Sequence, residues 1–421
     1  MKKIFWASVV MMSLVACGEN ESDTLLTPDE QKVEMETIAS DLMTEFAATE
    51  FEDVMETVSD LYLSCEETFA GDYDWSALES VYEERYDEAV KFEEIGKYDE
   101  RYTYSLLFST ISGSITLGEN AATYKDAENT TVEYTDDNGI KWTAEITPVG
   151  TVKTVYLGES VSTSGGIVSD FDGGSSSVQE YNEYTRVTVS VPEKLVVSLK
   201  KNGQDYLTST TTFDISISKD GVDVEKDKVS VTTTLEAQGV KVVLEKLSLD
   251  ATSGKHAQSA KLYKDGKFIC SVKSSVEGDI DFEEEEWNAK NINVEVDLLG
   301  KMLIKGTCPD AKSIENIMEN ADPQSAKDWD RIVNNINTKY NLNVYFNGGS
   351  TPQAIMNLEA RWDGDEYAEC WTEPAIQFND GSRYLLYEYF TEDNFSETVE
   401  GAESFVEKYE RLIDMYFGFW S

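Results

Sequence analysis

The chain has 421 residues and a formal net charge of −46 at pH 7, from 81 acidic and 35 basic residues. A surface of this charge repels nucleic-acid phosphates and anionic lipid headgroups, so neither is expected as an electrostatic partner. The length suffices for two or three domains with a sizeable core. The single histidine, His256, leaves histidine-based triads and zinc sites without enough residues.

The first 16 residues have the features of an export signal. A short basic start, Met1-Lys2-Lys3, precedes an apolar run that ends at Ala16 and is too short to span a bilayer as a helix. The run ends in Leu14-Val15-Ala16-Cys17, which resembles the lipobox of bacterial lipoproteins. The resemblance implies a signal peptide over residues 1–16 and a lipid (palmitate) anchor on Cys17. The alternative is an ordinary signal peptide followed by a chance cysteine.

Residues 17–26 form an acidic tether, because Glu19, Glu21 and Asp23 follow the cysteine within six residues. This pattern resembles that of surface-exposed lipoproteins of Bacteroidetes-type bacteria, although Asn20 and Ser22 interrupt the acids. The resemblance implies attachment to the outer membrane, with the protein facing the cell exterior. The rest of the chain is similar in style to uncharacterised large lipoproteins of that group.

Residues 27–99 are predicted to be a helical segment. Thr27-Pro28-Asp29-Glu30 has the residues of a capping box, with proline in the first turn. Apolar residues then recur at helical spacing, and a further helix is predicted from Trp75 to Phe92.

Residues 100–307 are predicted to be an antiparallel β region built of long hairpins. Apolar and polar residues alternate over 140–146, which is the period of a half-buried strand and assigns Trp142 to the core. Two-residue turns are predicted at Asn138-Gly139, Asn202-Gly203, Asp220-Gly221 and Asp265-Gly266. The Ser/Gly-rich residues 159–180 are interpreted as a mobile loop.

Residues 308–421 are predicted to be a smaller C-terminal α+β block. Helices are expected over 309–321, 325–340 and 396–417, and strands around 356–363 and 367–378. The fold class is therefore α+β, with N-terminal helices, a large antiparallel sheet region and this C-terminal block.

Four cysteines remain once Cys17 is assigned to the anchor: Cys65, Cys270, Cys308 and Cys370. An even number in an oxidising envelope permits two disulfides with three connectivities, and buried free thiols are the competing interpretation.

Catalytic motifs are not found: there is no G-x-S-x-G elbow and no glycine-rich phosphate loop. Calcium is the one cofactor that the sequence suggests, because Asp279, Asp281 and Glu283 lie in an acidic run of hard oxygen ligands. The alternative is a solubilising acidic loop. His256 is interpreted as a surface-loop residue.

One strand suggests a ligand-binding platform. Tyr367, Glu369 and Trp371 share a face by the two-residue period, while Cys370, Ile376 and Phe378 share the other. Two aromatics and an acid facing outward would allow a sugar ring to stack. The alternative is that helix 396–417 covers this face.

The sequence therefore predicts a non-catalytic envelope lipoprotein, not an enzyme, which binds a glycan or another envelope protein and no nucleic acid. The alternative is a carrier of lipid or another hydrophobic ligand within a curved β-sheet. A carboxylate-dependent envelope hydrolase is the third hypothesis.

Overall fold

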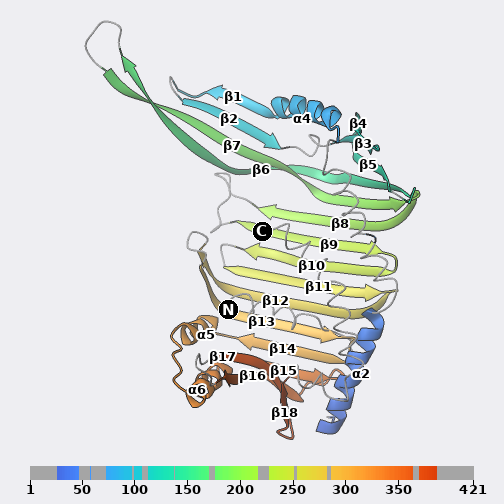
Figure 1. The fold of residues 1–421 in the computed structure, drawn as a ribbon, viewed down its shortest axis with the longest axis vertical. Helices are drawn as coiled ribbons and strands as arrows, with labels where there is room; N and C mark the ends of the chain where they lie inside the picture. The colour runs from blue at the N-terminus through green and yellow to red at the C-terminus, as the bar shows by residue number, and fades with distance from the viewer. Residues whose placement is uncertain are drawn as a thin grey trace. The chain divides into compact units, whose positions relative to one another are not determined.

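The computed structural model has an α+β fold dominated by β-strands, which confirms the predicted fold class (Figure 1). The structure describes residues 26–46, 57, 73–96, 99–106, 112–136, 138–169, 176–216, 227–250, 254–281, 286–363 and 369–385. The described residues include no helix long and apolar enough to cross a membrane.

The chain divides into two compact units that do not follow chain order. Unit 1 comprises residues 1–59, 236–249 and 253–421, and unit 2 comprises residues 60–235 and 250–252. The N-terminal helix thus belongs to the same unit as the C-terminal block.

Unit 2 contains one described helix and the first nine strands. Its elements are α4 (Ser76–Ala89), β1 (Val90–Glu94), β2 (Asp99–Leu106), β3 (Gly113–Leu117), β4 (Ala122–Lys125), β5 (Thr130–Thr135), β6 (Lys141–Ser169), β7 (Ser176–Lys201), β8 (Gln204–Ser216) and β9 (Lys228–Ala237). The pairs β2–β7 and β3–β5 are parallel, whereas β6–β7 and β7–β8 are antiparallel. Helix α4 ends at Ala89, short of the predicted Phe92, because Val90 already begins β1.

The β6–β7 hairpin corrects the prediction of a loop over 159–180. The two strands pair continuously to Ser169 and Ser176, apart from bulges near Val149 and Tyr156. Serine and glycine favour loops on their own, but cross-strand pairing in a long hairpin outweighs this local preference. At the base of the hairpin Trp142 is 4% exposed and packs on Tyr206, so its predicted core position is confirmed.

Unit 1 is a meander of antiparallel strands with one helix from the N-terminal part of the chain and two helices between β14 and β15. Its elements are α2 (Pro28–Phe46), β10 (Val240–Asp250), β11 (Lys255–Lys264), β12 (Lys267–Asp281), β13 (Glu286–Leu298), β14 (Met302–Cys308), α5 (Ala311–Glu319), α6 (Ala326–Asn337), β15 (Asn341–Phe346), β16 (Ala354–Asp363), β17 (Glu369–Phe378) and β18 (Arg383–Leu385). From β11 to β18 each strand pairs with the next in sequence.

One face of the unit 1 sheet carries the core. Cys270, Leu298, Met302 and Phe346 lie in register across β12 to β15 and are all buried. Apolar side chains of α2 pack on this row and complete one cluster; they are Met35, Ile38 and Leu42. The capping box that begins α2 is confirmed, since the Thr27 amide donates to Glu30 Oε2 at 2.8 Å.

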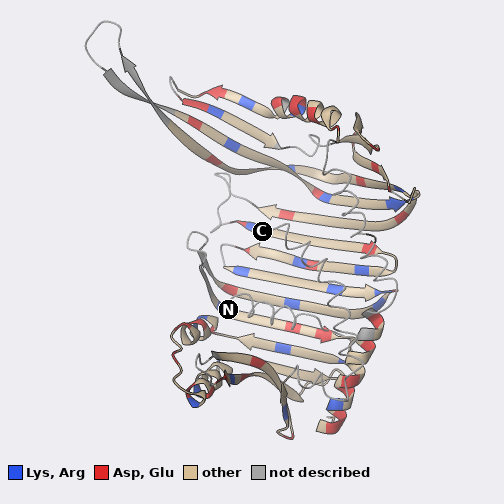
Figure 2. Cartoon of the chain, in the orientation of Figure 1, with Lys and Arg blue, Asp and Glu red and all other residues tan. Residues whose placement is uncertain are grey.

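The opposite face of the same strands is charged, as the two-residue period requires. Glu295 on β13 accepts from Lys273 on β12 at 2.6 Å and from Lys305 on β14 at 3.1 Å. These ion pairs run across neighbouring strands, and Figure 2 shows both signs of charge spread along them. The hydrophobic effect therefore places α2 on the apolar face of the sheet and not on this charged one.

Candidate functional site

The candidate site lies on the β16–β17 hairpin, where an exposed tryptophan stands beside an ion pair. In the register of these strands Arg361 lies opposite Trp371, and Glu359 lies opposite Glu373. Residues opposite each other, or two apart on one strand, project from the same face of a sheet. The hairpin thus gathers an aromatic ring and charged groups of both signs on one face.

Trp371 is fixed by its neighbours yet remains 43% exposed. Its indole Nε1 donates to Oε1 of Glu373 at 3.0 Å. Its backbone carbonyl accepts from the indole Nε1 of Trp329 on α6 at 2.7 Å. Trp329 is itself only 2% exposed, so its indole is held in place where it contacts β17. The exposed indole is therefore held in one orientation before any ligand arrives, which lowers the entropic cost of binding.

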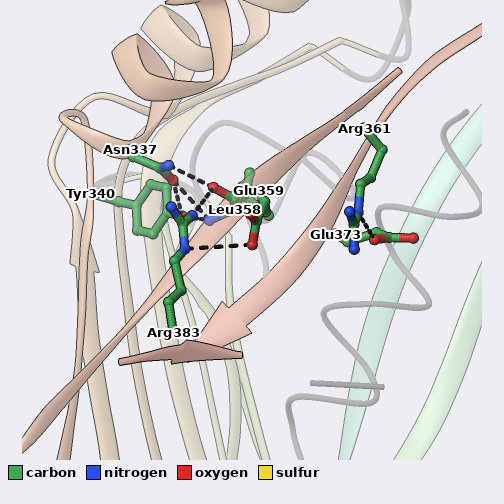
Figure 3. A network of polar contacts seen from close by, with 7 residues as sticks. All are labelled: Asn337, Tyr340, Leu358, Glu359, Arg361, Glu373 and Arg383. Atoms are coloured by element: carbon green, nitrogen blue, oxygen red, sulfur yellow. Dashed lines mark hydrogen bonds and ion pairs between the residues drawn. The ribbon is translucent and has the colours of Figure 1, made fainter. Parts of the chain in front are cut away.

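Glu373 holds the tryptophan and an arginine at once. Its Oε2 accepts from Arg361 Nε at 2.5 Å, while its Oε1 accepts from Trp371 (Figure 3 shows the Arg361–Glu373 pair). The side chains of Arg361 and Glu373 are 31% and 20% exposed. An ion pair that is half-buried keeps its geometry better than a fully exposed one.

A second arginine, Arg383, pairs with the neighbouring carboxylate of Glu359. Arg383 on β18 lies 3.5 Å from Glu359, measured from Nε to Oε2, and also donates to the Leu358 carbonyl at 3.1 Å. Glu359 and Glu373 lie directly opposite each other, an arrangement that is destabilising for like charges alone. One arginine beside each carboxylate offsets that repulsion.

The base of the site is fixed where β16 diverges from β15. These strands pair only at Asn343–Ile355 and Val344–Ala354, which leaves the backbone of Leu358 without a strand partner on that side. The side-chain amide of Asn337 replaces the strand, since it donates to the Leu358 carbonyl at 2.7 Å and accepts from its amide at 2.9 Å (Figure 3).

Tyr340 adds two hydrogen bonds to the contact between Asn337 and Leu358. Its hydroxyl donates to Asn337 Oδ1 at 2.7 Å and accepts from the Leu358 amide at 3.0 Å. Burial raises the pKa of Tyr340 to about 12, so it stays a neutral donor at all ordinary pH values. These contacts hold the hairpin that presents Trp371.

The arrangement suits binding better than catalysis. The indole offers a flat apolar face, and Arg361 and Glu373 lie beside it to favour polar substituents of a ring. Both carboxylates, Glu359 and Glu373, are engaged by arginines, whereas a glycosidase needs one acid and one base or nucleophile held apart for the substrate.

The structure places the three predicted platform residues as follows. Trp371 is outward, on the face opposite the buried Ile376, as the alternation predicted. Glu369 begins β17 opposite Asp363, and the structure describes its backbone position only. Tyr367 lies outside the described residues, as does the predicted covering helix 396–417.

The residues that sequence reasoning missed are the charged partners Arg361, Glu373 and Arg383. Glu373 follows Trp371 by two positions, so extending the same period would have found it. Arg361 required the register of the hairpin, and Arg383 required the neighbouring strand.

The predicted calcium ligands lie at and just beyond the end of β12. Asp279 and Asp281 lie at the end of β12, paired in register with Asn288 and Glu286 of β13, and Glu283 lies outside the described residues. Among the described residues no group of three or more His, Cys, Asp or Glu side chains is placed to hold a metal ion. Calcium binding by this acidic run remains a prediction.

The described cysteines are free thiols. Cys270, Cys308 and Cys370 form no disulfide, so the pairing of Cys308 with Cys370 that the sequence allowed is absent, and Cys65 lies outside the described residues. Burial raises the pKa of Cys270 to about 11 and also raises that of Cys308. A thiol with a raised pKa reacts slowly, which suits a structural role.

His256 lies in a strand rather than in the predicted surface loop. It belongs to β11, opposite Val276, and is half-buried. Partial burial lowers the pKa of His256, so its neutral form is favoured at pH 7.

Comparison with protein-family models, with curated proteins and with solved structures yields no significant match to this chain.

Proposed function

We propose that this chain is a lipid-anchored lipoprotein of the bacterial outer membrane that faces the cell exterior and binds a glycan without transforming it. The observation that carries the binding function is the exposed indole of Trp371, held by Glu373 and Trp329. The lipobox-like Leu14-Val15-Ala16-Cys17 and the acidic tether support the location.

The chemistry of the site favours a sugar ring as the ligand. One face of a pyranose is a patch of C–H groups that stacks on an aromatic ring, and its hydroxyls seek hydrogen-bond partners beside the ring. Trp371 supplies the ring, and the Arg361–Glu373 pair lies at its edge. Tryptophan and arginine are also the residues that contribute most often to binding energy at protein surfaces.

The hydrophobic-carrier hypothesis receives less support. A carrier needs a cavity of several hundred Å³ lined by apolar side chains. In unit 1 the apolar residues of α2 instead pack against the sheet, with Ile38 and Phe346 each 1% exposed. The proposal therefore does not include lipid transport.

A glycan array probed with the full chain tests the binding function. Wild-type protein binds a subset of glycans, and Trp371→Ala lowers binding to them at least tenfold, which corresponds to about 1.4 kcal/mol. Trp371→Phe keeps an aromatic face and retains part of the affinity. Phe92→Ala, which removes a 50% exposed aromatic on β1 of unit 2, is the matched control and leaves binding unchanged.

Two results would contradict this function. Equal binding by wild type and Trp371→Ala would remove the site from the proposal. Release of a shortened glycan on incubation would show catalysis instead of binding.

A further inference from the structure

Leu26, where the described chain begins, is held by two buried glutamines, Gln353 next to β16 and Gln31 on α2. Its amide donates to Gln353 Oε1 at 2.9 Å, and its carbonyl accepts from Gln31 Nε2 at 2.8 Å. Gln31 and Gln353 are 0% and 1% exposed. Breaking hydrogen bonds to buried amides is costly, so the position of Leu26 on the sheet is fixed.

Two loops lie at this point of the sheet. The loop 347–352 leads into Gln353, whose backbone amide donates to the Val344 carbonyl at 2.8 Å. The tip of the β17–β18 hairpin, residues 379–382, lies beside the first turns of α2, since Lys32 is 3.6 Å from Asp380 and 5.4 Å from the ring centre of Phe378. We call Leu26 and these two loops the Leu26 end.

The distance from this end to the proposed anchor is short. Cys17 precedes Leu26 by nine residues. A fully extended chain of that length reaches at most about 32 Å, and a flexible one averages roughly 17 Å between its ends. An acyl chain on Cys17 lies in the bilayer, so the Leu26 end cannot lie farther than that from the headgroups.

We infer that the Leu26 end of unit 1 faces the bilayer that holds the anchor, with the phospholipid headgroup layer as its partner. The inference rests on the proposed lipid anchor at Cys17. The short reach of the chain between Cys17 and Leu26 carries the inference, and the loop 347–352 at this end contains no charged residue.

The same geometry places Trp371, the exposed ring of the candidate site, away from the membrane. Phe378 belongs to the core beneath α2, and Trp371 precedes it by seven residues on β17, roughly 23 Å along the strand. Helices α5 and α6 lie at the end of the strands opposite α2 (Figure 1). Trp371 is therefore presented at the far end of the strand from the bilayer, where a glycan outside the cell would meet it.

Fluorescence quenching in vesicles tests this orientation. The full-length acylated protein carries a fluorophore at Ser350→Cys in the Leu26 end, or at Glu319→Cys at the end of α5, with Cys65, Cys308 and Cys370 replaced by serine. Both labelled positions are exposed in the structure. Phosphatidylcholine vesicles with a nitroxide on the headgroup should quench the label at position 350 at least threefold more than the label at position 319.

The outcomes separate the orientation from the anchor. If mass spectrometry shows acylated Cys17 but position 319 is quenched as strongly as position 350, the orientation is wrong and the anchor stands. If Cys17 carries no acyl chain and the protein does not bind vesicles, both are wrong.

Hydrogen exchange on the unsubstituted acylated protein gives the same test without labels. Attachment to vesicles should slow exchange in residues 347–352 and 379–382 more than in residues 311–319. Equal protection of the three segments would overturn the inference.

Discussion

The backbone amide of Leu26 donates to the side chain of Gln353, a contact at 2.9 Å between residues 327 positions apart. It joins the start of α2 to the loop before β16 and so closes unit 1 around its core. Gln353 also donates to the Phe346 carbonyl at 3.4 Å. Its side-chain amide therefore contacts two backbone groups, and the Phe346 carbonyl also accepts from the Gly349 amide at 3.0 Å.

Gln353→Leu should lower the free energy of unfolding by about 1–3 kcal/mol, because the Leu26 amide and the Phe346 carbonyl lose a buried partner. Denaturant unfolding followed by circular dichroism measures the change. Gln258→Leu on the exposed part of β11 is the control and should change stability by less than about 0.5 kcal/mol. Equal stability of both variants would show that Gln353 does not hold the helix.

Asp297 should make the protein less stable as the pH rises. Its carboxyl is 3% exposed, one oxygen has no hydrogen-bond partner, and burial raises its pKa from 3.8 to about 8. The folded state thus holds a proton that the unfolded state releases, so stability falls between about pH 4 and pH 8. A shift of this size is worth on the order of several kcal/mol.

Asp297→Asn removes that titration. The variant should be more stable than wild type at pH 8 and should lose most of the gain at pH 4, as measured by urea unfolding at a series of pH values. Asp330→Asn on the exposed side of α6 should leave the pH dependence unchanged. A wild-type stability that rises from pH 5 to pH 8, with no effect of Asp297→Asn, would refute the assignment.

Two glycines in unit 1 separate backbone strain from steric collision. Gly254 and Gly266 both have positive φ, +58° and +76°. A Cβ on Gly254 would collide with the Gly278 carbonyl oxygen, whereas a Cβ on Gly266 would meet nothing within 4 Å.

Gly266→Ala should therefore cost about 1 kcal/mol, from strain alone, and Gly254→Ala distinctly more. Thermal unfolding of the two variants side by side measures the difference. If Gly254→Ala lowered the melting temperature less than Gly266→Ala, the close approach of Gly254 to Gly278 at the open end of the β11–β12 hairpin would be wrong.

Glu373→Leu should weaken glycan binding through Trp371. Removal of the carboxylate breaks its hydrogen bond with the indole Nε1 and its ion pair with Arg361, so the ring loses its fixed orientation. The affinity for the glycan should fall about three- to tenfold, while the far-ultraviolet circular dichroism spectrum should change little. Glu319→Leu on α5 removes a carboxylate elsewhere and should bind as wild type does; calorimetric titration compares the two.

Local features of the sequence predicted much of the fold. The capping box of Thr27 and Glu30 and the turn at Asp265-Gly266 follow from short-range chemistry, and both are present. The turn at Leu299-Gly300 was not predicted, although its φ angles of 50° and 78° are of the same kind. Leucine rarely adopts positive φ, so no local signal marked it. Leu299 also packs against the core, which helps to offset that cost.

Long-range relationships could not be predicted in the same way. Periodicity assigned Trp371 to an outward face, but the register that sets Arg361 opposite it depends on the whole hairpin. The contact of Leu26 with Gln353 joins two ends of the chain, and no local pattern encodes it. Ser/Gly-rich residues in β6 and β7 were misassigned because pairing between strands outweighed local preference.

The most direct test of the central claim is a glycan titration of full-length protein followed by NMR of its 15N-labelled indoles. The Nε1–H signal of Trp371, assigned by its loss in Trp371→Phe, should shift progressively and saturably, while that of the buried Trp142 stays in place. A saturable shift of other signals with the Trp371 signal unmoved would contradict the proposed site.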